Sequence, residues 1–125
     1  MTKVLSIIES GMSPNCGHLY QQLGYTETHV NSMRKAISKI KSNVFDYIVC
    51  EFAYGYGNDY AGVTISNLDV MLYSLQKYSA DTRVVVIVDK AEQQYIHKLT
   101  DLFKIHTVLI YPEASLNDIG EALTS

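Results

Sequence analysis

The chain has 125 residues, of which 47% are hydrophobic and 18% charged, a composition typical of one soluble globular domain and not of a disordered chain. Its formal net charge of −3 excludes a general electrostatic attraction to nucleic acid or to anionic lipid. No apolar run is long enough to cross a bilayer and the first residues do not resemble a signal peptide, so we expect a cytoplasmic domain without membrane contact.

Five short runs rich in β-branched or aliphatic residues are predicted to form strands. In chain order they are 4–8, a weaker run at 27–30, then 47–52, 84–88 and 107–111. Three of these runs show no alternation of polar and apolar residues. This pattern is typical of strands that are buried on both faces, as in a parallel sheet covered by helices.

Helices are predicted between the strands and after the last one, because apolar side chains recur there three and four positions apart. The five sets are Leu19, Tyr20 and Leu23; Met33, Ala36, Ile37 and Ile40; Ile65, Leu68, Met71, Leu72 and Leu75; Ile96, Leu99, Leu102 and Phe103; Leu116, Ile119 and Leu123. The predicted boundaries are the N-caps Asn31, Ser66 or Asn67, and Ser115, and the helix stop Gly24.

This alternation predicts a single α/β domain over residues 1–125, with a doubly wound parallel sheet of five strands in the order 2-1-3-4-5. Ligands of such sheets bind outside the carboxyl ends of the strands, at the switch point between the first and third strands. Glu51 ends the third predicted strand and therefore lies at the centre of the expected crevice.

The runs KVLSIIES, FDYIVCEF, TRVVVIVDKA and TVLIYPEA resemble the first, third, fourth and fifth strands of the receiver domains of two-component response regulators, the chemotaxis regulators among them. The resemblance covers nearly the whole chain and implies the same flavodoxin-like (βα)5 fold. It also implies a pocket in which acids hold magnesium, an aspartate accepts a phosphoryl group, and a hydroxyl and a lysine bind that group. The corresponding residues of this chain are Glu9, Ser10, Glu51, Asp89, Tyr111 and Pro112.

The acidic half of this pocket departs from the family pattern. The pair of acids is replaced by Ile8 and Glu9, or by Glu9 and Ser10 if the register slips by one residue, so one carboxylate is missing in either case. Glu51 stands where the family has its phosphoacceptor aspartate, and its extra methylene displaces the attacking oxygen.

The half of the pocket that binds the phosphoryl group departs as well. Asp89 occupies the position of the switch hydroxyl and would repel a phosphoryl group. Tyr111 replaces the lysine and offers no cation, whereas Pro112 is retained. These departures predict a degenerate receiver, or pseudo-receiver, that is not an enzyme and whose signalling does not depend on phosphorylation.

Three interpretations of Glu51 remain open from the sequence. It is a solvated acid at a strand end, a fixed charge that partly mimics phosphoaspartate, or a residue that still accepts a phosphoryl group. Glu9 and Glu51 are also weak candidates for a Mg²⁺ site with Asp89. We expect an ion pair with Lys90 or Lys3 in its place, and no metal or other cofactor, because the metal-ligand set is incomplete.

The segment after the third strand alternates tyrosine with glycine, and Tyr54, Tyr56 and Tyr60 are the candidate anchors of a protein-binding loop. The alternative is an exposed insertion without a ligand. A second alternative is a flavodoxin-like protein, because ESGMSPNCG and YGYGNDY loosely resemble loops that bind flavin mononucleotide. Pro14 argues against it, since it removes a backbone donor that a phosphate would need.

The resemblance implies signalling through a protein partner or an output domain, with this chain either free-standing or the N-terminal part of a longer regulator. Receivers commonly form dimers or output contacts through the fourth helix, the fifth strand and the fifth helix. Carried over to this chain, that face includes Tyr95, Lys98 and residues 115–122. Val108 stands at the aromatic switch position of the family, so the usual coupling between pocket and face is not expected.

Overall fold

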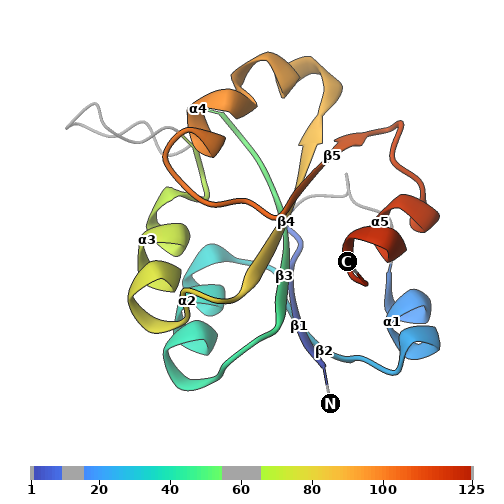
Figure 1. Ribbon diagram of the computed structural model, residues 1–125. Helices are drawn as coiled ribbons and strands as arrows, with labels where there is room; N and C mark the ends of the chain where they lie inside the picture. The colour runs from blue at the N-terminus through green and yellow to red at the C-terminus, as the bar shows by residue number, and fades with distance from the viewer. Residues whose placement is uncertain (1, 10–15, 55–65, 125) are drawn as a thin grey trace.

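The computed structural model describes residues 2–9, 16–54 and 66–124, and its centre is a parallel sheet of five strands (Figure 1). The strands are β1 (Lys3–Ile7), β2 (Thr26–Val30), β3 (Tyr47–Glu51), β4 (Arg83–Asp89) and β5 (Thr107–Tyr111). Their order is β2-β1-β3-β4-β5, and every pairing is parallel. The predicted fold class and strand order are confirmed, with each strand end within one residue of its predicted position.

Helices cover both faces of the sheet (Figure 1). They are α1 (Gly17–Leu23), α2 (Met33–Ser42), α3 (Asp69–Tyr78), the 3-10 helix η1 (Lys90–Tyr95) that leads into α4 (Ile96–Thr100), and α5 (Leu116–Ala122). One apolar cluster joins the sheet to α2, α3 and α4, and a second joins its other face to α1 and α5. Right-handed crossovers between parallel strands produce this two-sided arrangement.

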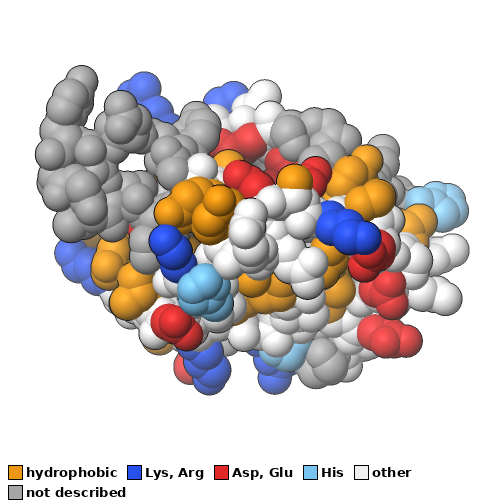
Figure 2. Space-filling view, turned by 90° about the horizontal axis from the view of Figure 1, so that it is seen from above, with side chains coloured by type: hydrophobic (Ala, Val, Ile, Leu, Met, Phe, Trp, Pro, Cys, Tyr) orange, Lys and Arg blue, Asp and Glu red, His pale blue; other side chains and the backbone are white. Residues whose placement is uncertain are grey.

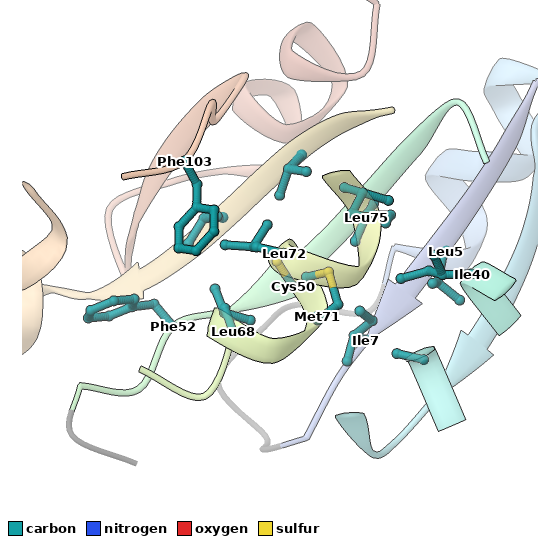
Figure 3. Close-up of a cluster of buried hydrophobic side chains, with 14 of the residues drawn as sticks. Leu5, Ile7, Ile40, Cys50, Phe52, Leu68, Met71, Leu72, Leu75 and Phe103 are labelled. Atoms are coloured by element: carbon teal, nitrogen blue, oxygen red, sulfur yellow. The ribbon is translucent and has the colours of Figure 1, made fainter. Parts of the chain in front are cut away.

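The first cluster is centred on α3, where the buried side chains of Met71, Leu72 and Leu75, with the N-cap Leu68, point towards the strands (Figure 3). Cys50 of β3 lies beneath this helix and is fully buried. The central strands are buried on both faces as predicted, because helices pack against each side of them.

Two of the four predicted helix ends are confirmed, and the N-caps of α2 and α3 are wrong. Ser115 caps α5 in a capping box with Asp118, and Gly24 ends α1 in the left-handed conformation at a φ of 75°. The N-cap of α2 is Ser32 and not Asn31. The Ser32 hydroxyl accepts the backbone N–H of Lys35, whereas the Asn31 side chain accepts a hydrogen bond from the Lys35 ammonium.

The start of α3 also differs from the prediction, since its N-cap is Leu68 rather than Ser66 or Asn67. Ser66 lies in the turn before the helix, where its hydroxyl accepts the Leu68 N–H and donates to Asp69. The Asn67 side chain points away from the helix and bonds to the end of β3.

The fourth helix is shorter than its apolar spacing predicts. Helix α4 ends at Thr100, so Leu102 and Phe103 are not on one helical face with Leu99. The backbone N–H groups of Leu102 and Phe103 both bond to the carbonyl of Leu99, and this tight turn buries Phe103 while it leaves Leu102 57% exposed. The turn is needed because the chain must reverse to enter β5.

Within the described ranges, no helix has the length and apolar character that a membrane crossing requires.

Candidate functional site

The candidate site lies at the carboxyl ends of β1, β3 and β4, where the sequence predicted a crevice. Figure 2 views the molecule from above, and acidic side chains gather near the upper middle of this face. Glu51 ends β3, Glu9 follows β1, and Asp89 ends β4. The sheet therefore brings the acidic residues of the predicted pocket together at the carboxyl ends of its strands.

Glu51 is buried, with only 4% of its surface exposed. Its Oε1 atom accepts the backbone N–H of Glu9 at 2.9 Å, so the carboxylate joins the end of β3 to the segment that follows β1. The interpretation of Glu51 as a solvated acid is therefore wrong. A buried carboxylate needs hydrogen-bond donors, and the backbone beyond β1 provides one.

Asn67 holds the same region together, although the sequence indicated it only as an N-cap. Its Nδ2 donates to the carbonyl oxygen of Glu51 at 2.8 Å and to Oε1 of Glu9 at 3.0 Å. Its Oδ1 accepts the N–H of Ala53 at 2.8 Å. One side chain thus bonds to the segments that follow both β1 and β3. No sequence motif marks it, because its partners lie 14, 16 and 58 residues away.

Asp89 does not join the two glutamates in a metal site. Its carboxylate accepts the N–H of Ala91 at 2.8 Å and caps η1. Among the residues that the structure describes, no group of three or more histidine, cysteine, aspartate or glutamate side chains is placed to hold a metal ion. Glu9 and Glu51 are close together, but as a pair they offer few of the oxygen ligands that magnesium requires.

The two lysines that we expected to pair with this cluster of carboxylates lie elsewhere. Lys90 bonds to Glu113 at 3.0 Å, and both side chains are more than 60% exposed. Lys3 begins β1 at the opposite end of the sheet from Glu51, which ends the parallel neighbour β3. The Glu51 carboxylate accepts the backbone N–H of Glu9 instead.

Tyr111 and Pro112, which stand at the Lys-Pro positions of receivers, also lie at the carboxyl end of the sheet. Tyr111 pairs with Asp89 in the β4–β5 register and packs against the apolar cluster beneath α1 and α5. Pro112 is exposed and follows a cis peptide bond. Ser10, the remaining residue of the predicted pocket, lies outside the described residues.

Cys50 lies next to Glu51 near the end of β3. Burial raises the pKa of its thiol, and the negative charges of Glu9 and Glu51 raise the pKa further. A thiol held in its protonated form is a poor nucleophile and a poor metal ligand. Cys50 is therefore a core residue, and Cys16 and Cys50 are both buried and form no disulfide.

Tyr54 is half-buried and packs within the domain. Its ring stacks on Tyr95 with centroids 4.0 Å apart and planes 5° apart. Its hydroxyl accepts a hydrogen bond from the Lys98 ammonium at 3.0 Å, and its backbone N–H donates to Glu92 at 3.3 Å. These contacts connect the end of β3 to η1 and α4. The hydrogen bond to the Tyr54 hydroxyl, together with the electrostatic interaction with that group, raises the pKa of Lys98.

The other two tyrosines of the predicted loop, Tyr56 and Tyr60, lie outside the described residues, as do most of the residues on which the flavin alternative depends. The residues on either side of this stretch are paired. Tyr54 forms an antiparallel bridge with Ser66, and Ala53 exchanges hydrogen bonds with Asn67. We call these four residues the stem.

No protein-family model matches the sequence, and no curated protein matches it as a relative. Solved structures do match. A CheY-like receiver domain protein from Methanospirillum hungatei superposes with a TM-score of 0.75 at 8% identity, over 99% of this chain and 91% of that one. The fold is that of a receiver domain.

Two further receiver structures agree with this fold. Chemotaxis protein CheY4 of Vibrio cholerae matches with a TM-score of 0.68 at 16% identity, over 99% of this chain and 97% of that one. A response regulator of Burkholderia pseudomallei, solved with a phosphorylated aspartic acid, calcium and citrate, matches with a TM-score of 0.64 at 20% identity. That match covers 98% of this chain and 66% of the other. At such identities the likeness concerns the receiver fold alone.

Proposed function

We propose that this chain is a receiver-like signalling domain that acts through protein contacts, without catalysis and without phosphorylation. The receiver fold supports a signalling role, since the similar structures are response regulators. The observation that carries the proposal is the state of Glu51. At the phosphoacceptor position the chain has a buried carboxylate that already accepts a backbone hydrogen bond.

The surroundings of Glu51 support the same proposal. Phosphoryl transfer in receivers needs a metal ion and cationic or hydroxyl groups to stabilise the developing charge. Here Asp89 and Tyr111 stand at the positions that would supply the hydroxyl and the lysine, and Asp89 caps η1. Glu51 would then act as a fixed negative charge that holds the segment after β1 in one arrangement.

The test is a labelling reaction with acetyl phosphate and magnesium, followed by intact mass measurement. We expect no phosphorylated product from the wild type, while an ordinary receiver domain under the same conditions is labelled. The variant Glu51→Asp restores the family residue but not the rest of the pocket, so it should also remain unlabelled. Labelling of the wild type that is lost in Glu51→Gln would overturn the proposal and identify Glu51 as a phosphoacceptor.

The same proposal assigns the contact surface to η1–α4, β5 and α5. Strand β5 is a sheet edge and is half-exposed, and Leu116 at the start of α5 is 47% exposed. Tyr95 and Lys98 lie on this face and contact Tyr54, which links the face to the end of β3. Val108 packs against the core, so an aromatic rotamer relay has no counterpart here.

This surface would serve a homodimer or an output partner, and size-exclusion chromatography with light scattering tests the first of these. If the wild type is a dimer through this face, Leu116→Asp should convert it to a monomer. Glu27→Lys on the opposite sheet edge is the control and should leave the dimer unchanged. One similar structure is the N-terminal domain of a three-domain response regulator from Carboxydothermus hydrogenoformans, which supports a place for this domain in a longer regulator.

A further inference from the structure

A surface cavity of about 370 Å³ lies at the amino ends of β4 and β5, at the opposite end of the sheet from Glu51. Its apolar lining comes from Leu72 and Leu75 of α3, Val84 of β4, and Phe103. Figure 3 shows Leu72 between Phe103 and Leu75. The volume falls within the range of roughly 300–1,000 Å³ that is usual for small-molecule sites, and benzene already fits an apolar cavity of about 150 Å³.

The polar part of the lining carries both signs of charge. Asp81 supplies a carboxylate, Lys104 an ammonium group and Gln76 an amide, and all three residues are exposed. Within the described parts of the chain, neither Asp81 nor Lys104 forms an ion pair, since the Lys90–Glu113 pair is elsewhere. A ligand with a single charge would be attracted by one of these groups and repelled by the other.

Two other charged or titratable residues of the lining are already engaged elsewhere. Arg83 donates to the hydroxyl of Tyr47 at 3.2 Å and lies over its ring. His106 packs edge-on against the same tyrosine. Tyr47 belongs to the cluster on the other face of the sheet, so these two side chains are directed away from the α3 side. Asp81 and Lys104 are therefore the charged residues of the lining that have no hydrogen-bond or ion-pair partner among the described residues.

The wall of the cavity is held in place by hydrogen bonds. The Thr82 hydroxyl donates to the carbonyl of Phe45 at 2.7 Å, and it also bonds to the Ser79 hydroxyl at 2.7 Å. The backbone of Arg83 bonds to Asp46 at 3.0 Å. A wall fixed in this way loses little entropy when a ligand binds, which favours affinity.

We propose that this cavity binds a small zwitterion with a compact apolar body, of the class of the apolar α-amino acids. The apolar side chain would pack against Leu75, Val84 and Phe103, while the ammonium and carboxylate groups would face Asp81 and Lys104. Such a ligand matches both charges of the lining at once. The proposal is independent of Glu51, because the two sites lie at opposite ends of the sheet.

The experiment is a nuclear magnetic resonance titration of the full chain with L-phenylalanine at millimolar concentrations. We expect saturable shifts at the methyl groups of Leu72, Leu75 and Val84, with no change at the Glu51 amide. Phenethylamine and 3-phenylpropionate each lack one of the two charges. Each analogue should bind roughly two- to fivefold more weakly than phenylalanine, because it loses one solvent-exposed ion pair. Its remaining charge is also repelled by the like charge of the lining, which weakens binding further.

Two kinds of variant make the test specific. Ala80 is exposed at the cavity, so Ala80→Trp should block it without disturbing the core, and the shifts should disappear. Asp81→Asn and Lys104→Gln should each weaken phenylalanine binding, whereas Glu121→Gln on α5 should not. The proposal is overturned if no saturable shifts occur, if they survive Ala80→Trp, or if the singly charged analogues bind as well as phenylalanine.

Discussion

The variant Asn67→Ala tests whether one amide side chain holds the candidate site together. It removes the donor to the Glu51 carbonyl and the acceptor for the Ala53 N–H, both of which are partly buried. A buried backbone group left without a partner costs about 1–3 kcal/mol. Because both groups here are only partly buried, we expect a total loss of about 2–4 kcal/mol. The bond to the exposed Glu9 carboxylate adds little, since water replaces it.

Urea denaturation followed by circular dichroism measures this loss as a lower midpoint at an unchanged slope. For a domain of this length the thermal midpoint should fall by roughly 8–15 °C. Asn117→Ala is the matched control, because Asn117 is exposed and its change should stay within about 0.5 kcal/mol.

The variant Asn67→Asp separates the roles of the two amide atoms. It keeps an acceptor for the Ala53 N–H but turns a carboxylate oxygen towards the Glu51 carbonyl and the Glu9 carboxylate. It should therefore be at least as unstable as Asn67→Ala at neutral pH, and it should partly recover in acid as the new carboxylate is protonated. The reasoning is refuted if Asn67→Ala unfolds within about 0.5 kcal/mol of the wild type.

Three further predictions concern the core, the stem and a helix cap. Burial raises the pKa of the Cys50 thiol, so the unfolded chain releases a proton that the native state keeps. The free energy of unfolding should then fall above about pH 8.5, by at most about 1.4 kcal/mol per pH unit from this thiol, and Cys50→Ala should flatten that decline in urea titrations. Tyr54→Ala should lower the free energy of unfolding by roughly 1–3 kcal/mol, because it loses the stack on Tyr95. Tyr54→Phe keeps the stack, so its thermal midpoint should stay close to that of the wild type. Ser115→Ala should lower the free energy of unfolding by about 1 kcal/mol and speed amide hydrogen exchange at the start of α5. Unchanged exchange there would contradict the capping box.

The strands were predictable because their signal is local. Continuous β-branched runs such as the one in β4 are compatible with a doubly covered parallel sheet and with few other structures. The right-handed crossover rule then leaves few strand orders to choose from. Local signals also explain the success at Ser115 and Gly24, where the cap depends on the residue itself.

The burial of Glu51 was not predictable, because it depends on donors that arrive from distant parts of the chain. Glu9 lies 42 residues before it, and Asn67 reaches its carbonyl from 16 residues beyond. The sequence identified where Glu51 lies but not what it contacts. Tyr54 shows the same limit, since an aromatic residue among glycines suggests a surface anchor until its stack on Tyr95 is seen.

The stem bears on how freely this protein's sequence can change at one position. Asn67 exchanges hydrogen bonds with Ala53 and also donates to the Glu51 carbonyl and to the Glu9 carboxylate. A single substitution at this position would therefore alter the pairing of the stem and the contacts of the candidate site together. Evolution can change the two features separately only at their other residues.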